Sequence, residues 1–208
     1  NVDSLSKVKI ISKNNIEKLI NFKLSGDVAL VTYHSVTLDK KSSKSNFLEI
    51  LKALESFKNL KIIFTKTNSD TDGRIINTLI DQFVKKNKDR SISYVSLGQL
   101  KYINLLRYIS LMVGNSSSGI IETPYFKLPV INIGDRQEGR IFGKNIINSP
   151  PNYIFITKAI NKGLSIKFKK SLDKMIDPHF KKKNAKKIFN KIVSLKKFQD
   201  TKKDFYNL

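Results

Sequence analysis

The sequence predicts an α/β fold whose mostly parallel sheet is doubly wound, as in Rossmann-like domains. Short apolar runs rich in β-forming residues alternate with stretches of helical periodicity along most of the chain, and polar clusters follow several of these runs. Strands that alternate with helices are joined by crossovers, which produce a parallel sheet covered on both faces. Ligands bind such sheets beyond the carboxyl ends of the strands. The polar clusters are therefore the places in which to search for a site.

The individual elements are predicted from the spacing of apolar residues. Val28–Tyr33 is a continuous apolar run, typical of a strand that is buried on both faces. Apolar residues recur at helical spacing over Asn46–Phe57 and Gly73–Lys86, and Leu60–Phe64 is a strand between them. Pro129–Ile133 is the last predicted core strand. The alternation also includes Ser91–Val95, Gln99–Tyr108, Leu111–Val113, Ser117–Phe126 and Tyr153–Ile156.

The length and composition indicate one domain. A chain of 208 residues with 40% hydrophobic content can bury one core. We expect residues 1–26 to be a lead-in segment with a helix over Asn15–Phe22, and residues 27–208 to form the Rossmann-like domain. The absence of cysteine excludes disulfides and thiolate metal sites. No signal peptide and no apolar run of roughly 20 residues is present, which predicts a cytoplasmic protein without membrane contact. The first residue is Asn rather than Met, which suggests a fragment.

The net charge of +22 raises the question of nucleic-acid binding. Only five of the 39 basic residues are arginine, whereas nucleic-acid binders favour arginine's planar fork. Residues 161–208 carry 15 lysines against four acids, and Ile188, Ile192 and Leu195 fall on one face of an amphipathic helix there. A solvated lysine face is the favoured interpretation of this tail, and a polyanion site is the alternative.

The stretch Gly114-Asn115-Ser116-Ser117-Ser118-Gly119 follows a predicted strand and opens a helix. Serine hydroxyls beside the free N–H groups of a helix start favour a diphosphate, although serine and asparagine are also common caps. Glu122 lies one turn further along, where a carboxylate can accept hydrogen bonds from a ribose diol or merely complement the helix dipole.

His34 ends the first predicted strand and should point toward the same crevice. A histidine there can bind phosphate or transfer a proton near neutral pH, or it can be a hydrogen-bonded loop residue. His179, in the basic tail, is expected to be an exposed residue without such a role.

The loop Thr67–Arg74 follows the second predicted strand and contains Asn68 and Asp70. Its alternating acids resemble the start of an EF-hand calcium loop. The other ligands of such a loop and its closing glutamate are missing, so no metal site is predicted. A contact from this loop to a sugar or nucleotide stays open.

The loop Gly134–Arg140 follows the last predicted strand and places Arg136 and Arg140 between glycines. Arginines there can reach a diphosphate as charged donors. A surface loop with an internal ion pair is the weaker alternative.

These stretches, together with Thr32-Tyr33-His34 and Ser96-Leu97-Gly98-Gln99, occur in an order and spacing that resembles one family. It is the hydrolysing UDP-N-acetylglucosamine 2-epimerases of bacterial sialic-acid biosynthesis. The resemblance is close over residues 28–160 and looser beyond, where Asp177-Pro178-His179-Phe180 stands in place of a glycine-rich turn. It implies the C-terminal, UDP-binding half of a GT-B architecture with two Rossmann-like domains.

The resemblance also implies roles for the individual residues. Ser116 and Ser117 would bind the diphosphate, with Asn115, Ser118 and Gly119 beside them. Glu122 would hold the ribose, Ser96 and Leu97 the uracil, and Arg136 would lie near the diphosphate. His34 would be the catalytic residue of this half, and Asn68 and Asp70 would contact the nucleotide sugar.

The family reaction needs no cofactor and no metal. UDP is eliminated across C1 and C2 of the sugar, and water adds to the glycal, which gives N-acetylmannosamine. The proton-transferring acids belong to the N-terminal domain, so a chain without that domain is expected to bind UDP weakly and to be inactive. The full-length enzyme is expected to be a homo-oligomer that binds no nucleic acid. The alternatives are an epimerase for a UDP-diacetamido-trideoxyhexose of legionaminic-type pathways and a GT-B glycosyltransferase.

Overall fold

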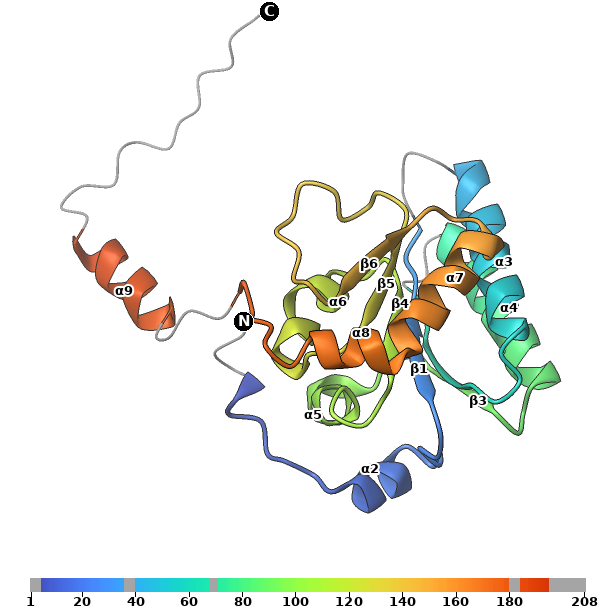
Figure 1. Cartoon of the computed structure of the whole chain (residues 1–208), viewed down its shortest axis with the longest axis horizontal. Coiled ribbons are helices and arrows are strands. Elements are labelled where there is room, and N and C mark those ends of the chain that lie inside the picture. The colour runs from blue at the N-terminus through green and yellow to red at the C-terminus, as the bar shows by residue number, and fades with distance from the viewer. Residues whose placement is uncertain (1–4, 36–39, 68–70, 180–183, 195–208) are drawn as a thin grey trace, which may run out of the picture.

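A computed structural model describes residues 5–35, 40–67, 71–179 and 184–194. Its centre is a six-stranded parallel sheet of order β3-β2-β1-β4-β5-β6 (Figure 1). The strands are β1 (Val28–Thr32), β2 (Lys61–Thr65), β3 (Ser91–Tyr94), β4 (Leu111–Gly114), β5 (Val130–Ile133) and β6 (Ile146–Ser149). This is the doubly wound, Rossmann-like order, and it confirms the predicted fold class.

Helices cover both faces of the sheet. One layer contains α3 (Lys40–Glu55), α4 (Thr71–Lys86) and α7 (Tyr153–Leu164) (Figure 1). The other contains α2 (Lys13–Leu19), α5 (Gly98–Leu105), α6 (Ser117–Ile121) and the 3₁₀ helix η1 (Thr123–Phe126). Alternate residues of β1 serve the two layers: Ala29 and Val31 pack toward α3 and α4, and Val28 and Leu30 toward α2 and α5.

The sheet extends one strand further than predicted. β6 lies beyond β5, so the prediction that Pro129–Ile133 is the last core strand was wrong. This strand has only two apolar residues, Ile146 and Ile147, followed by Asn148 and Ser149. An edge strand that is partly exposed does not need the apolar, β-rich run from which the other strands were predicted.

The helix predicted over Ser117–Phe126 is interrupted. α6 ends at Ile121, and the chain continues as a 3₁₀ turn with Pro124 near its start. Proline lacks the N–H that would continue an α-helical ladder. Lys127 closes the turn in the left-handed region at φ 52°. Glu122 is the C-cap of the short α6, just over one turn from the start of the helix.

The lead-in segment packs against the sheet. The helix predicted near its centre is present as α2, with Ser12 as its side-chain cap. Leu5, Ile16, Ile20 and Leu24 are fully buried in the cluster that also contains residues of β1 and α5. The proposed boundary at residue 26 stays a prediction.

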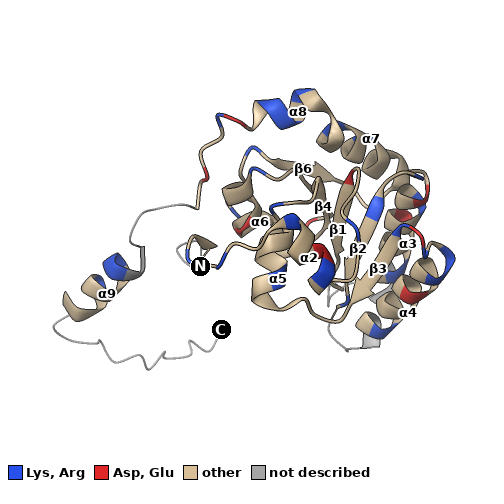
Figure 2. Ribbon diagram, turned by 90° about the horizontal axis from the view of Figure 1, so that it is seen from below, with Lys and Arg blue, Asp and Glu red and all other residues tan. Residues whose placement is uncertain are grey.

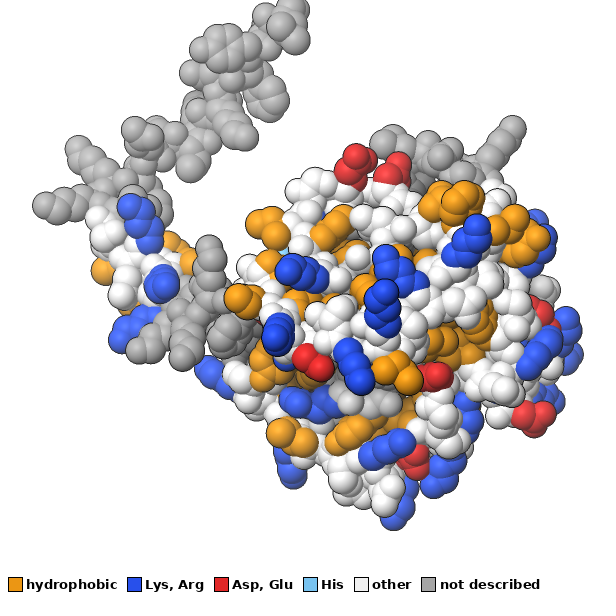
Figure 3. Space-filling model, in the orientation of Figure 1, with side chains coloured by type: hydrophobic (Ala, Val, Ile, Leu, Met, Phe, Trp, Pro, Cys, Tyr) orange, Lys and Arg blue, Asp and Glu red, His pale blue; other side chains and the backbone are white. Residues whose placement is uncertain are grey.

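The lysine-rich C-terminal region contains α8 (Ile166–Ser171) and α9 (Asn184–Ser194). The ribbon of Figure 2 is coloured for basic residues on both helices, and α9 extends away from the sheet and its helices (Figure 1). Ile188 and Ile192 are exposed, and Leu195 lies outside the described residues. Basic side chains on the face seen in Figure 3 are scattered among apolar ones. Among the described residues no helix has both the length and the apolar character to cross a membrane.

Candidate functional site

The candidate site is a crevice at the carboxyl edge of the sheet, where the strand order changes direction between β1 and β4. Thr32 at the end of β1 is level with Thr65 of β2 and Gly114 of β4. The crevice has a volume of about 420 Å³. Its walls come from the ends of β1 and β2, the turn before α5, α5 itself and α6. This is the place where Rossmann-like sheets bind their ligands.

Gly114 allows β1 and β4 to run side by side to their ends. Its φ is +136°, a conformation that residues with a side chain rarely adopt. A Cβ atom at this position would lie only 1.9 Å from the carbonyl oxygen of Thr32. Any larger residue would push the two strand ends apart beneath the crevice.

Asn115 joins three loops under the crevice. Its side-chain Oδ1 accepts from the backbone N–H of His34 at 2.7 Å, and its Nδ2 donates to the His34 carbonyl at 2.8 Å. The Asn115 carbonyl accepts from Arg136 Nη1 at 2.9 Å and from Gln137 Nε2 at 2.7 Å. Asn115 is only 1% exposed, so its amide fixes the loop that carries His34 rather than facing the open crevice.

The three serines at the start of α6 have different environments. Ser116 caps the helix, and its Oγ accepts from the backbone N–H of Ser118 at 3.3 Å. Ser118 Oγ donates to Glu122 Oε2 at 2.6 Å and is also hydrogen bonded to the Tyr102 hydroxyl. Ser117 opens the helix between them. The Ser118 hydroxyl is thus held by the side chain of Glu122 as well as lining the crevice.

Tyr102 reaches the crevice from α5. Burial raises the pKa of its phenol above the ordinary value, and the nearby Glu122 carboxylate raises it further, whereas the hydrogen bond to Ser118 acts the other way. The phenol therefore keeps its proton at neutral pH and is available as a hydrogen-bond donor.

The crevice is also lined by residues at the ends of β1 and β2, namely Thr32, His34, Thr65 and Lys66. His34 Nδ1 lies 3.3 Å from Thr67 Oγ1, and the Thr32 and Thr65 hydroxyls are hydrogen bonded at 2.5 Å. Lys66 Nζ forms an ion pair with Asp81 Oδ2 at 2.7 Å, which holds one cationic side chain at the rim. The hydroxyls and the imidazole of these residues are suitable partners for an anionic ligand, whereas the Lys66 ammonium group already has Asp81 of α4 as its partner.

The structure brings together six of the predicted site residues, and they come from three separate segments of the chain. The predicted residues that line the crevice are His34, Ser96, Leu97, Ser116, Ser118 and Glu122. Their contacts with a nucleotide stay predictions.

Four other predicted residues of the described chain lie beside or below the crevice. Asn115 and Arg136 are joined through the Asn115 carbonyl. Gly119 faces the sheet, where an added Cβ would lie 3.2 Å from Val130 Cγ1. Ser117 is not part of the lining. Asn68 and Asp70 lie outside the described residues.

Sequence reasoning missed Tyr102, Lys66 and Thr65 in the crevice lining. Thr65 and Lys66 carry a signal that was available, because they sit at the carboxyl end of the second predicted strand. Tyr102 carries none: it lies within a helical pattern, where an aromatic residue normally belongs to the core.

Within the described residues no group of three His, Asp or Glu side chains is placed to hold a metal ion. The polar side chains that line the crevice instead carry hydroxyls, the Gln99 amide, one carboxylate, one imidazole and one ammonium group.

Comparisons with known proteins give consistent results for this chain. The family model described as UDP-N-acetylglucosamine 2-epimerase matches residues 1–193. A GDP/UDP-N,N'-diacetylbacillosamine 2-epimerase (hydrolyzing) of Campylobacter jejuni is 40% identical over 71% of this chain and 38% of its own length. The polysialic acid biosynthesis protein P7 of Escherichia coli is 35% identical over 86% of this chain and 46% of its own length.

Solved structures show the same fold. The crystal structure of Methanocaldococcus jannaschii UDP-GlcNAc 2-epimerase in complex with UDP-GlcNAc and UDP superposes with a TM-score of 0.66 at 19% identity, over 93% of this chain and 51% of that one. The chain spans less than half the length of the two curated relatives. The family model nevertheless covers every strand of the sheet and every segment that lines the crevice, and the chain therefore belongs to the UDP-N-acetylglucosamine 2-epimerase family.

Proposed function

We propose that this chain is the UDP-binding half of a hydrolysing nucleotide-sugar 2-epimerase. The observation that carries the proposal is the Ser118–Glu122 pair on the wall of a crevice at the sheet's switch point. A carboxylate held in this position has a second oxygen with which to accept hydrogen bonds from a ribose diol. The other parts of UDP are then assigned to neighbouring segments of the crevice.

In this arrangement the uracil lies by the turn at Ser96 and Leu97, and the diphosphate lies beside Ser116 and Ser117 at the start of α6. His34 and Lys66, on the facing wall, approach the diphosphate and the reacting sugar. Arg136 donates a hydrogen bond to the carbonyl of Asn115, whose side chain holds the loop of His34. The guanidinium has further N–H groups for a phosphate. His34 is the proposed catalytic residue, acting beside the bond between UDP and the sugar.

The proposed reaction breaks the bond between C1 of the sugar and the UDP oxygen with loss of the C2 proton, and water then adds to the glycal. The products are UDP and the free amino sugar, with C2 inverted. The residues that move the C2 proton are proposed to lie outside this chain, because it spans only about half of its relatives. The family match favours this reaction over glycosyl transfer.

Two amino sugars are candidates for the substrate. N-acetylglucosamine would give N-acetylmannosamine for a sialic-acid-type pathway. A diacetamido-trideoxyhexose is favoured by the Campylobacter relative at 40% identity, which is named for diacetylbacillosamine. Both share the UDP part, so the crevice described above serves either one. A cytoplasmic site of reaction and a homo-oligomeric full-length enzyme stay predictions.

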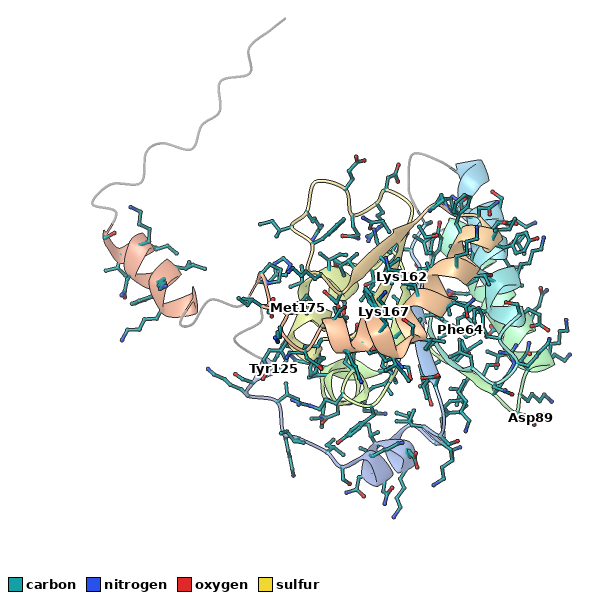
Figure 4. All side chains as sticks on the ribbon, viewed as in Figure 1. Phe64, Asp89, Tyr125, Lys162, Lys167 and Met175 are labelled. Carbon is teal, nitrogen blue, oxygen red and sulfur yellow. The ribbon has the colours of Figure 1, made fainter. Side chains whose placement is uncertain are left out.

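The test is a calorimetric titration of UDP into the unmodified chain and into Glu122→Ala. We expect saturable binding to the unmodified chain and at least about tenfold weaker binding to the variant, since it loses charge-assisted hydrogen bonds. Asp89→Ala is the matched control: this acid precedes the amino end of β3 and is exposed at the edge of the molecule (Figure 4). Equal UDP affinity for Glu122→Ala and Asp89→Ala would contradict the proposed site.

A further inference from the structure

Three side chains from two helices form a chain of hydrogen bonds that ends in the crevice. Tyr102 of α5 is hydrogen bonded to Ser118 Oγ of α6, and Ser118 Oγ lies 2.6 Å from Glu122 Oε2. All three residues line the crevice. The link between Tyr102 and Ser118 spans 16 positions of sequence, so it depends on how α5 and α6 pack on the same face of the sheet.

The direction of these hydrogen bonds follows from the protons available. An ionised carboxylate only accepts, so the hydroxyl proton of Ser118 is directed to Glu122. Ser118 Oγ must then accept from Tyr102, whose phenol has a single proton to donate. The other acceptor near that proton is Met112 Sδ, at 3.9 Å, and a thioether sulfur is a weak acceptor. The chain therefore runs from Tyr102 through Ser118 to Glu122.

The direction of these hydrogen bonds fixes how the Glu122 carboxylate is oriented. Oε2 is engaged by Ser118, which leaves Oε1 as the oxygen with which to meet a ligand. Because the Ser118 hydroxyl is itself held by Tyr102, the carboxylate has one preferred orientation before any ligand binds. A preorganised acceptor discriminates strongly between ligands with and without a matching hydroxyl.

We propose that Tyr102 is a positioning residue which, through Ser118, aims Glu122 at the ribose and makes the site selective for ribonucleotides over 2'-deoxyribonucleotides. The inference rests on the proposed function, in which Glu122 holds the ribose of UDP. It assigns to Tyr102 a role that a purely structural phenol would not have.

The experiment compares UDP with 2'-deoxy-UDP in calorimetric titrations of the unmodified chain and of Tyr102→Phe. We expect the unmodified chain to bind 2'-deoxy-UDP at least about tenfold more weakly than UDP. In Tyr102→Phe the UDP affinity should fall roughly fivefold while the affinity for 2'-deoxy-UDP stays nearly the same, so the selectivity collapses. Ser118→Ala should give the same collapse, and the two changes together should not add, because they break one chain of hydrogen bonds.

Tyr108→Phe is the matched control. Its hydroxyl donates to the Ile11 carbonyl at 2.6 Å, away from the crevice, so this variant should keep the selectivity of the unmodified chain. If Tyr102→Phe weakens both nucleotides equally, or leaves the selectivity unchanged, the positioning role is overturned. An unmodified chain that binds UDP without selectivity also overturns it, and the proposed function survives. An unmodified chain that binds neither nucleotide overturns both.

Discussion

The body around the sheet and the isolated helix α9 use polar residues in opposite ways. In the body, Asn115 accepts and donates four hydrogen bonds that join three loops, and Ser118 links Tyr102 to Glu122. In α9, Lys186, Lys187 and Lys191 are exposed, and the apolar residues beside them are exposed as well. The body is thus built from groups with fixed partners, whereas α9 presents separate charges to the solvent.

If the crevice binds UDP as proposed, the net charge of a region does not indicate where the anion binds. Half of the excess of positive charge lies in residues 161–208, yet among the described residues that line the crevice Lys66 is the only lysine or arginine. A site with little net charge can still recognise an anionic ligand through hydroxyls and N–H groups that are already held in place by hydrogen bonds. Such groups need not reorganise when the ligand binds.

The largest effect is expected from changing the scaffold of the crevice. Gly114→Ala should destabilise the protein by at least about 3 kcal/mol, because the new Cβ meets the Thr32 carbonyl and the backbone conformation disfavours a side chain. Chemical unfolding in urea measures the change. UDP binding should be lost as well, since both strand ends support the crevice.

Gly26→Asn is the control for that variant. Gly26 also has a positive φ, of +70°, but an added Cβ there would meet nothing within 4 Å, and asparagine tolerates this conformation. We expect a loss of less than about 1 kcal/mol. Similar losses for the two variants would show that the close approach at Gly114 does not matter.

The parts of the fold that follow a simple periodic pattern could be predicted from the sequence. Five of the six strands follow from short runs rich in apolar and β-forming residues, and the crevice follows from the polar residues at their ends, His34 and Ser116 among them. The sequence was insufficient where a residue depends on a distant neighbour. The edge strand β6 is held by pairing with β5, and the role of Tyr102 depends on α6.

The second largest effect, on stability, is expected from replacing Glu17, a carboxylate that does not line the crevice. The backbone N–H of Leu24 and then the ammonium of Lys23 hold the pKa of Glu17 below its ordinary value. A lowered pKa stabilises the folded chain above the unfolded-state pKa of about 4.3, and this contribution disappears as the pH falls through the folded-state pKa. Glu17→Gln should therefore lower the melting temperature at pH 7, and the difference should shrink at an acidic pH below the unfolded-state pKa.

Asp27→Asn provides the comparison for Glu17→Gln. Asp27 pairs with Lys169 at 3.3 Å, and both side chains are exposed to solvent. Exposed pairs contribute about 0–1 kcal/mol, so the melting temperature should hardly change at either pH. If Glu17→Gln behaves in the same way at both pH values, its hydrogen bonds make no contribution that depends on its charge.

The smallest effect on the site is expected from α9. Replacing Lys186, Lys187 and Lys191 with Gln should leave the UDP affinity within about twofold, because these lysines do not line the crevice and exposed charges are screened by salt. The same variant should elute from a polyanion column at a lower salt concentration, since each phosphate contact of a lysine contributes about one unit to the salt dependence. A large fall in UDP affinity at moderate salt would mean that the lysines of α9 reach the nucleotide. The distinction between a site of fixed partners and a solvated cationic helix would then fail, and the crevice would have to be redefined to include α9.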